Sequence, residues 1–156
     1  MSYSFQSDQD IFFMKQALKE ARKSFSLDEV PVGCVLVVNQ KIIARAHNAV
    51  EKNNCVTSHA EIICIQKASK ILRNWRLTDA VLYSTLEPCL MCAGAILLSR
   101  IKKLVWGASD LRIGVSGSWI NVFKQNYPFH SLEIVSGVLK ENSEKMMKDF
   151  FKKRRN

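Results

Sequence analysis

The sequence lacks an apolar run long enough to span a membrane, and it lacks a second closely spaced pair of cysteines or histidines. A membrane-spanning helix needs about 20 predominantly apolar residues, so the first absence predicts a protein without one. The N-terminus also lacks the charged and apolar regions of a secretory signal. The five cysteines are odd in number, which argues against a disulfide framework and for a reducing compartment. We therefore expect a cytoplasmic protein.

Linkers, low-complexity tracts and internal repeats are lacking as well. The chain has 156 residues, of which 47% are apolar, and this is enough to build one core. We expect a single domain over residues 1–156. Basic residues outnumber acidic ones by 23 to 14, and the resulting net charge of +9 makes a polyanionic partner plausible.

Cysteine chemistry concentrates in residues 86–92, where Cys89 and Cys92 lie three positions apart. Pro88 is typical of the first position of a helix, so both thiols should lie on one face of its first turn. The positive end of a helix favours the thiolate form that zinc requires. The pair supplies only two ligands, whereas a structural zinc site normally has four. Taken alone, the pair could also be redox-active or consist of two buried thiols.

His59 is the best candidate for a third ligand. It begins a segment with apolar residues at helical spacing, and Thr57 and Ser58 before it are good helix caps. One histidine and two cysteines leave a fourth position open for water, which is typical of a catalytic zinc site. Glu61 would lie near that water and could take its proton. The alternative is a capping box, in which Glu61 merely bonds the backbone of Ser58.

Hydrophobic patterns predict the elements around these residues. A helix should begin at Ser7 to Asp10 and continue to Phe25, and another should begin at Pro88. The expected strands are residues 30–38, 41–46, 80–84, 103–106 and 132–135. Residues 51–56 should form a polar loop, and Gly137 should precede a C-terminal helix over about residues 140–155. The helix from Pro88 should connect two parallel strands in a right-handed β-α-β unit.

The segment with His59 and Glu61 and the segment with Cys89 and Cys92 together resemble a known signature. Residues 59–61, His-Ala-Glu, with residues 88–92, Pro-Cys-Leu-Met-Cys, are similar to the motif of the cytidine deaminase-like zinc deaminases. Within that superfamily, the chain most resembles the bacterial tRNA-specific adenosine deaminases, from about residue 10 to residue 155. The further segments that carry this likeness are residues 30–33, 47–48, 85–95, 99–101, 114–118 and 150–155.

The resemblance implies a fold, a reaction and partners. The fold would be a three-layer α/β/α sandwich around a mixed sheet of about five strands. His59, Cys89 and Cys92 would hold one Zn²⁺ ion per subunit, with one bound water, and Glu61 would carry the proton. The reaction would be hydrolysis of adenosine to inosine at the wobble position of a tRNA anticodon, by a homodimer. The alternatives are a deaminase of free cytidine or guanine, and a non-enzymatic zinc-stabilised RNA-binding protein.

The resemblance also implies contacts between the protein and the target nucleotide. Asn48 and Val30 would contact the nucleoside, and Asp110 would lie near the bound nucleotide. A turn is the plainer explanation of both polar residues. The chain departs from the family at Cys55, where Asp-Pro is common just before the threonine, and at Ser109, where arginine is common.

The C-terminal segment is both aromatic and basic. Residues 140–156 hold seven basic and three acidic side chains. By resemblance, Phe150, Phe151 and Arg154 would meet the anticodon loop, since aromatic rings stack on unpaired bases and cations meet phosphates. The plainer alternatives are that the aromatic rings belong to the core and that the basic helix is a solvated face.

Overall fold

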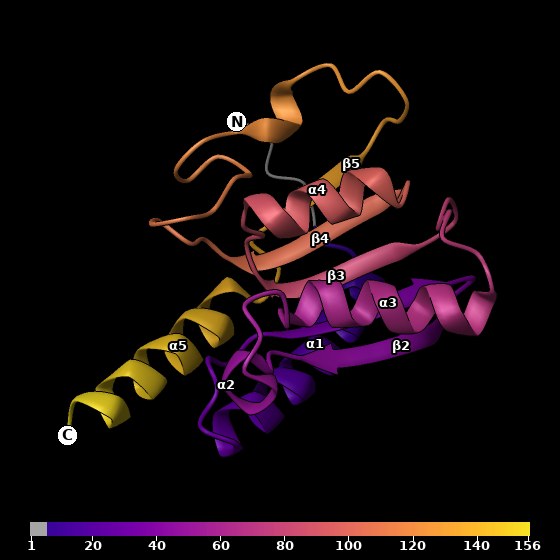
Figure 1. The fold of residues 1–156 in the computed structure, drawn as a ribbon. Helices are drawn as coiled ribbons and strands as arrows, with labels where there is room; N and C mark the ends of the chain where they lie inside the picture. The colour runs from indigo at the N-terminus through magenta and orange to yellow at the C-terminus, as the bar shows by residue number, and fades with distance from the viewer. Residues whose placement is uncertain (1–5) are drawn as a thin grey trace.

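A computed structural model describes residues 6–156 as a five-stranded mixed sheet between two layers of helices (Figure 1). The strand order is β2-β1-β3-β4-β5. β1 pairs antiparallel with both β2 and β3, whereas β3, β4 and β5 are mutually parallel. The strands are β1 (Gly33–Val38), β2 (Lys41–His47), β3 (Val81–Leu86), β4 (Lys103–Ala108) and β5 (Glu133–Ser136). The expected fold class and the parallel β-α-β unit are confirmed.

Two pairs of helices cover the two faces of the sheet (Figure 1). The pair α1 (Asp8–Ser26) and α5 (Lys140–Arg155) lies on one face, and the pair α3 (Ala60–Leu72) and α4 (Leu90–Leu98) lies on the other. The short helix α2 (Val50–Asn53) precedes α3, and a 3-10 turn, η1 (Val122–Lys124), lies between β4 and β5. None of the helices described for residues 6–156 has the length and apolar character needed to cross a membrane.

Successive side chains of a strand point to opposite faces of the sheet, and the central strands carry apolar side chains on both faces. In β1, Cys34 and Leu36 join the core under α3 and α4, while Val35 and Val37 join the core under α1. The continuous apolar run of β1 therefore serves two cores. Since α3 and α4 both pack on the core that contains Cys34 and Leu36, their starts lie on the same side of the sheet.

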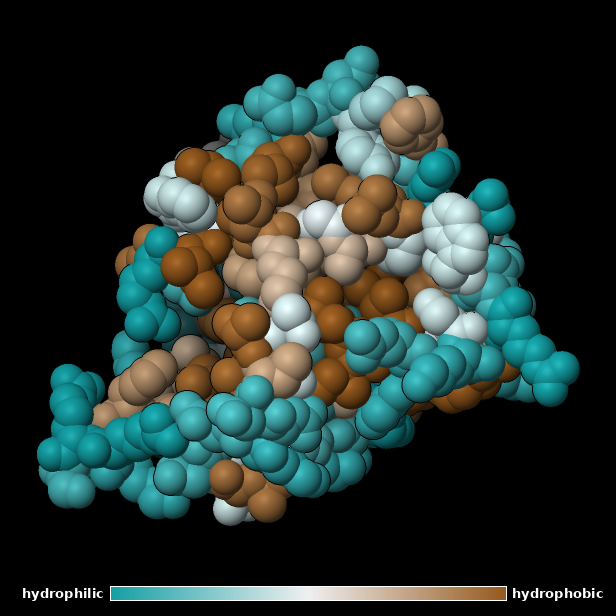
Figure 2. Space-filling model, viewed as in Figure 1, coloured by the Kyte–Doolittle hydropathy of each residue, from teal (hydrophilic) through white to brown (hydrophobic). Residues whose placement is uncertain are grey.

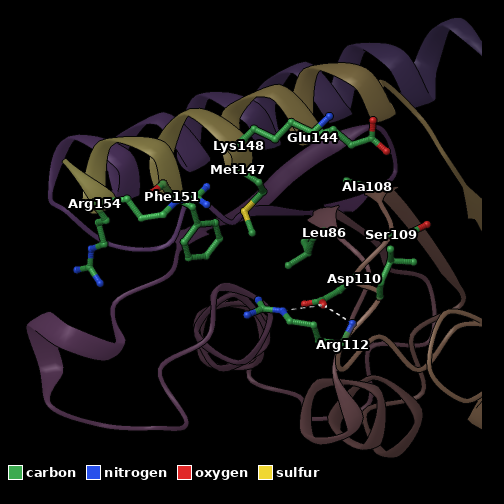
Figure 3. A pocket seen from close by; sticks show the side chains of 12 residues that line it. Leu86, Ala108, Ser109, Asp110, Arg112, Glu144, Met147, Lys148, Phe151 and Arg154 are labelled. Atoms are coloured by element: carbon green, nitrogen blue, oxygen red, sulfur yellow. Dashed lines mark hydrogen bonds and ion pairs between the residues drawn. The ribbon is translucent and has the colours of Figure 1, made fainter.

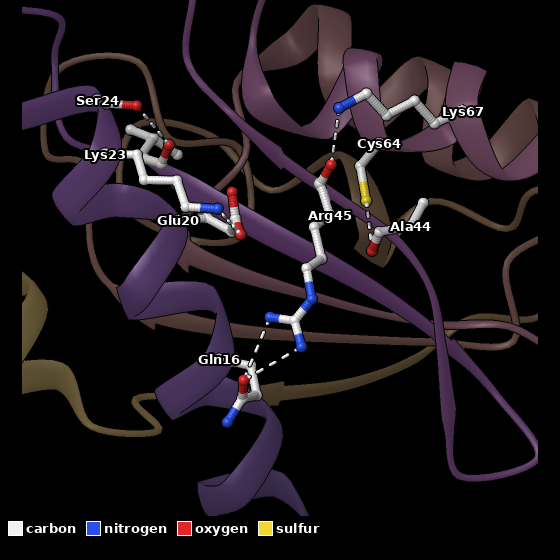
Figure 4. A network of polar contacts seen from close by, with 9 residues as sticks. Gln16, Glu20, Lys23, Ser24, Ala44, Arg45, Cys64 and Lys67 are labelled. Atoms are coloured by element: carbon white, nitrogen blue, oxygen red, sulfur yellow. Dashed lines mark hydrogen bonds and ion pairs between the residues drawn. The ribbon is translucent and has the colours of Figure 1, made fainter. Parts of the chain in front are cut away.

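The edge strand β2 is attached to a helix on each side (Figure 4). Lys67 of α3 donates to the backbone oxygen of Arg45 over 3.0 Å, and the Cys64 thiol donates to that of Ala44 over 3.6 Å. The guanidinium of Arg45 in turn donates to Gln16 Oε1 of α1 over 3.2 Å. These contacts fix α3, whose first turn carries the predicted acid–base residue, against the sheet.

Several predicted boundaries differ from those observed. The first strand begins at Gly33 and not at Val30, because Pro31 has no N–H to donate and Val32 N donates back to Val30 O over 2.9 Å. Pro88 does not open a helix, since Cys89 is the N-cap of α4. The predicted loop over residues 51–56 contains most of α2, whose C-cap, Asn54, has a φ of 47°.

Candidate active site

The three candidate zinc ligands converge at the starts of two helices. His59 is the N-cap of α3, Cys89 is the N-cap of α4, and Cys92 follows in the first turn of α4. His59 Nδ1 lies 3.6 Å from Cys89 Sγ and 3.5 Å from Cys92 Sγ. The three donor atoms all lie within 4.8 Å of one another.

This donor set fits zinc. Zn–S bonds of about 2.3 Å and Zn–N bonds of about 2.0–2.1 Å at tetrahedral angles place nitrogen and sulfur about 3.6 Å apart. The observed separations of 3.6 and 3.5 Å agree with that value. A hydrogen bond from the Cys92 thiol, and then the His59 ring, lower the pKa of Cys89 to about 4. The same hydrogen bond and burial raise the pKa of Cys92. The lowered pKa of Cys89 favours the thiolate form that zinc requires.

Glu61 lies beside this group and is only 4% exposed. Burial raises the pKa of its carboxyl above the ordinary value, although the Cys92 thiol and the His59 ring favour the charged form. Its Oε1 lies 3.3 Å from Ser84 Oγ and 3.6 Å from Cys34 Sγ, both of which can donate. These two donors come from β1 and β3.

The capping-box alternative for Glu61 is wrong. The helix begins after His59, one residue later than Ser58, and no side-chain cap bond is present at its start among the described residues. Ser58 Oγ instead accepts from Asn53 Nδ2 over 3.1 Å. Glu61 is therefore free of a capping role and faces the ligand group.

A cavity of about 230 Å³ opens above this group. Its lining includes His59, Glu61 and Cys89 from the starts of α3 and α4. It also includes the predicted substrate residues of four different segments: Val30, Asn48, Asp110 and Arg154. The fold thus brings most of the predicted site residues together. Glu29 and Arg112 also line the cavity and were missed from the sequence, because nothing in their local pattern distinguishes them from surface charges.

Glu29 determines how Asn48 faces the cavity. Glu29 is 1% exposed, its Oε1 accepts from the backbone N of Lys52 over 2.6 Å, and its Oε2 accepts from Asn48 Nδ2 over 3.3 Å. Since Asn48 Nδ2 is the donor in this bond, the amide NH₂ points toward Glu29. The carbonyl oxygen of the Asn48 side chain therefore remains available as an acceptor.

A wider groove of about 660 Å³ continues from the cavity along α5 (Figure 3). The groove and the cavity share five lining residues: Leu86, Asp110, Arg112, Met147 and Arg154. Asp110 Oδ1 accepts from the backbone N of Arg112 over 3.1 Å and of Ile113 over 3.4 Å. The carboxylate of Asp110 thus forms the turn, as the plainer alternative expected, while the residue also lines the cavity.

The two phenylalanines of α5 have different surroundings. Phe150 is 0% exposed and packs against Phe25 with ring centroids 5.8 Å apart, so the expected contact of its ring with RNA is wrong. Phe151 lines the groove, and the guanidinium of Arg112 lies 5.8 Å from its ring centre. Arg154 Nη2 donates over 3.0 Å to the backbone oxygen of Asp28, which lies just after α1. Phe151 and Arg154 are therefore available at the groove and Phe150 is core.

Comparison with known proteins agrees with this geometry. Residues 7–155 match the model of the MafB19-like deaminase family. The chain belongs to this deaminase family. It is 49% identical to the tRNA-specific adenosine deaminase of Bacillus subtilis (strain 168), covering 94% of this chain and 91% of that protein. It is also 49% identical to the tRNA-specific adenosine deaminase of Rickettsia typhi (strain ATCC VR-144 / Wilmington), covering 91% and 97%. The resemblance found in the sequence is confirmed.

Solved deaminase structures have the same fold. One, from a study of A-to-I editing by tRNA deaminases at the wobble position of transfer RNA, superposes with a TM-score of 0.83 at 43% identity. The match covers 86% of this chain and 98% of that one. The guanine deaminase from Nitrosomonas europaea superposes with a TM-score of 0.78 at 20% identity, covering 90% and 83%, which shows a shared fold alone.

Proposed function

We propose that this deaminase converts adenosine to inosine at the wobble position of a tRNA anticodon. The observation that carries the proposal is the His59, Cys89 and Cys92 group beside the buried Glu61, at the base of a cavity that opens onto a groove. Relatives at 49% identity are named tRNA-specific adenosine deaminases, which supports the choice of substrate.

His59, Cys89 and Cys92 would hold one Zn²⁺ ion per subunit. A zinc ion bound there supplies the Lewis acidity that makes water a nucleophile near neutral pH. The donor atoms of His59, Cys89 and Cys92 lie within 4.8 Å of one another, so the protein supplies the ligand geometry. The family is zinc-dependent in general, and the donor separations support the same metal here.

Glu61 would carry the protons of the reaction. It takes a proton from the attacking water and delivers it to N1 of adenine while the water oxygen adds to C6. It then takes the proton of the new C6 hydroxyl and passes it to the amino group. As the C6 carbonyl forms, the C6–N bond breaks and ammonia leaves, so that adenosine and water become inosine and ammonia. Burial raises the pKa of Glu61 above the ordinary carboxyl value, which makes its carboxylate a stronger base.

The groove beside α5 supports an RNA substrate. A nucleotide in the cavity would leave its neighbours in the groove, because the same residues line both. Phe151 offers a ring for stacking, and Arg112 and Arg154 offer charge to phosphates. Bases of an anticodon loop are already partly unstacked, so turning one into the cavity costs less than extruding it from a duplex.

The competing function is deamination of a free base or nucleoside. A guanine deaminase from Bacillus subtilis superposes with a TM-score of 0.62 at 28% identity, covering 93% of each chain. A free base would fill a cavity of about 230 Å³ and leave the larger groove without a role. The groove and its basic rim therefore favour RNA.

We also propose a homodimer. Figure 2 shows a broad apolar area in the middle of the face that carries α3 and α4. Exposed apolar side chains on these two helices and just after α3 contribute to this face: Leu90 and Leu98 of α4, Ile71 of α3, and Trp75. Exposed apolar areas of this kind are typical of protein interfaces. A second copy of the chain is the partner that the family resemblance supports.

The family match over residues 7–155 supports our proposal that the chain forms one deaminase domain. All the strands described lie in one sheet, in keeping with that proposal. We propose a cytoplasmic location because the proposed substrate is tRNA and the thiols of Cys89 and Cys92 must remain reduced to bind metal.

The decisive test is inosine formation from an anticodon stem-loop with adenosine at the first anticodon position. Wild-type protein should produce inosine, detected by mass spectrometry of the nucleosides. Glu61→Gln should lower kcat by about 10²–10⁴-fold, because the proton carrier is lost, while the zinc content stays the same. Glu20→Gln changes another buried glutamate, on α1, and should leave kcat within about twofold.

Two results would contradict the proposed function. Release of ammonia from free guanine or cytidine, with no inosine from the stem-loop, would move the protein to the small-substrate class. Full activity of Glu61→Gln on the stem-loop would remove Glu61 from the reaction.

A further inference from the structure

Glu87 is a buried carboxylate that the proposed reaction does not use. It is 3% exposed and lies directly after β3, two residues before Cys89. In the described part of the chain it belongs neither to the His/Cys group nor to the lining of the cavity. Burial of a charged group is costly unless the group is fully hydrogen-bonded, so its partners indicate its role.

Within residues 6–156, the Glu87 side chain has four hydrogen-bond donors, and all of them come from the segment between β4 and η1. Oε2 accepts from the backbone N of Asp110 over 3.0 Å and from the Ser118 hydroxyl. Oε1 accepts from the backbone N of Ser116 over 2.8 Å and of Ser118 over 3.1 Å. One side chain thus holds both ends of residues 110–118, which we call the rim loop.

Backbone contacts also attach the rim loop to the residues that follow β3. The backbone N of Val115 donates to Pro88 O over 3.0 Å. At Gly114, an added Cβ would overlap both the Glu87 carboxylate and the backbone oxygen of Asp110. The loop therefore fits around the carboxylate with no room to spare.

The rim loop carries three residues that line the cavity: Asp110, Arg112 and Ile113. The Glu87 carboxylate fixes the backbone of Asp110, and the Asp110 carboxylate fixes the backbone of Arg112 over 3.1 Å. We propose that Glu87 is a positioning residue, which holds the rim loop so that Asp110 and Arg112 face the RNA without itself touching the substrate. This inference rests on the proposed function.

Glu87→Gln tests the inference with little change in side-chain volume. A carboxamide has one acceptor oxygen, so its NH₂ would face the backbone N–H of Asp110, and two donors would oppose each other. We expect the KM for the anticodon stem-loop to rise by about 3–10-fold with kcat within about twofold, because the loop contributes to binding and not to proton transfer. Amide hydrogens of residues 110–118 should exchange faster in the variant.

Gly114→Ala perturbs the same contact from the loop side and serves if Glu87→Gln fails to fold. It should raise KM and speed exchange in the same segment. The effects of the two substitutions on KM should be less than additive, because both disrupt one contact. Glu20→Gln is the matched control, since it removes charge from another buried glutamate without contact to the rim loop, and its KM should equal that of the wild type.

Two outcomes would overturn the inference. Unchanged amide exchange over residues 110–118 in both variants would show that Glu87 does not hold the loop, whatever the activity. A fall in zinc content and kcat with KM unchanged would show that Glu87 acts through the Cys89 half of the ligand group. If wild-type protein forms no inosine, the proposed function fails, and the exchange measurement still decides whether Glu87 positions the loop.

Discussion

Phe150 and Phe151 are adjacent on α5, yet one ring is core and the other lines the groove. Phe150→Ala should lower the free energy of unfolding by about 3–5 kcal/mol, because it leaves a cavity among buried side chains. Phe151→Ala should lower it by less than about 1 kcal/mol. It should instead raise the KM for the stem-loop about tenfold, since stacking of one base is worth about 1–3 kcal/mol. Urea unfolding and steady-state kinetics on both variants check this.

The comparison within the pair makes the result interpretable. Equal losses of stability, with no change in KM for Phe151→Ala, would mean that both rings only pack the helix and that no base stacks there. A rise in KM for Phe150→Ala but not for Phe151→Ala would mean that Phe150, and not Phe151, contacts the RNA, which contradicts the prediction.

The site illustrates how far individual residues could be recognised from sequence. His59, Cys89 and Cys92 carry a spacing that only a few kinds of chemistry use, and the structure brings them together. Phe150 and Phe151 each follow a methionine by four positions, which is helical spacing in both cases. The sequence therefore could not show which of the two rings faces inward. Glu29 and Glu87 gain their roles from distant segments, and no local pattern records such contacts.

At the scale of elements, one buried polar cluster joins α1 to two strands. Tyr83 of β3 donates to Asp10 Oδ1 of α1 over 2.9 Å, and Lys103 of β4 lies 3.2 Å from Asp10 Oδ2. Asp10 is 4% exposed, so the partners of its carboxylate matter. The sequence placed Asp10 only at the start of the first helix, and the packing of α1 on the sheet shows its partners on β3 and β4.

Removing the Tyr83 hydroxyl should weaken this junction in a pH-dependent way. Tyr83→Phe should lower the free energy of unfolding by about 1.5–3 kcal/mol at neutral pH, since it removes a hydrogen bond to a charged group. Burial, and then Asp10, raise the pKa of Tyr83 in the folded protein above the unfolded value of about 10. This contribution to stability is therefore complete below about pH 10 and is lost as pH rises above it.

The free energies of unfolding of the wild type and of Tyr83→Phe should accordingly converge as the pH rises above about 10. Chemical unfolding at pH values from 7 to 11 measures the difference directly. Tyr127→Phe, a tyrosine in the segment between η1 and β5, is the control and should show neither the loss at neutral pH nor the convergence. A constant difference between Tyr83→Phe and wild type over the whole range would contradict the raised pKa.

At the scale of the whole molecule, the sequence predicts the layers of helices and sheet more accurately than it predicts where each helix and strand begins and ends. Strands such as β1 are apolar on both faces, and this requires helices on both sides of the sheet. The boundaries depend on single residues, such as Pro31 before β1 and Asn54 after α2, whose effect varies with their surroundings. The apolar face over α3 and α4 was not predictable from pattern, because its side chains have the same spacing as core residues.

That face yields a prediction for the assembly. Wild-type protein should sediment at twice the chain mass of 17.8 kDa, because covering the exposed side chains of α4 removes apolar surface from water. The double variant Leu90→Asp, Leu98→Asp should sediment as the single chain, since it places charge in the proposed interface. Phe12→Asp changes an exposed apolar side chain on α1, in the opposite layer, and should leave the dimer intact. A wild-type protein of single-chain mass at micromolar concentration would refute the dimer, and a dimeric double variant would place the interface on another face.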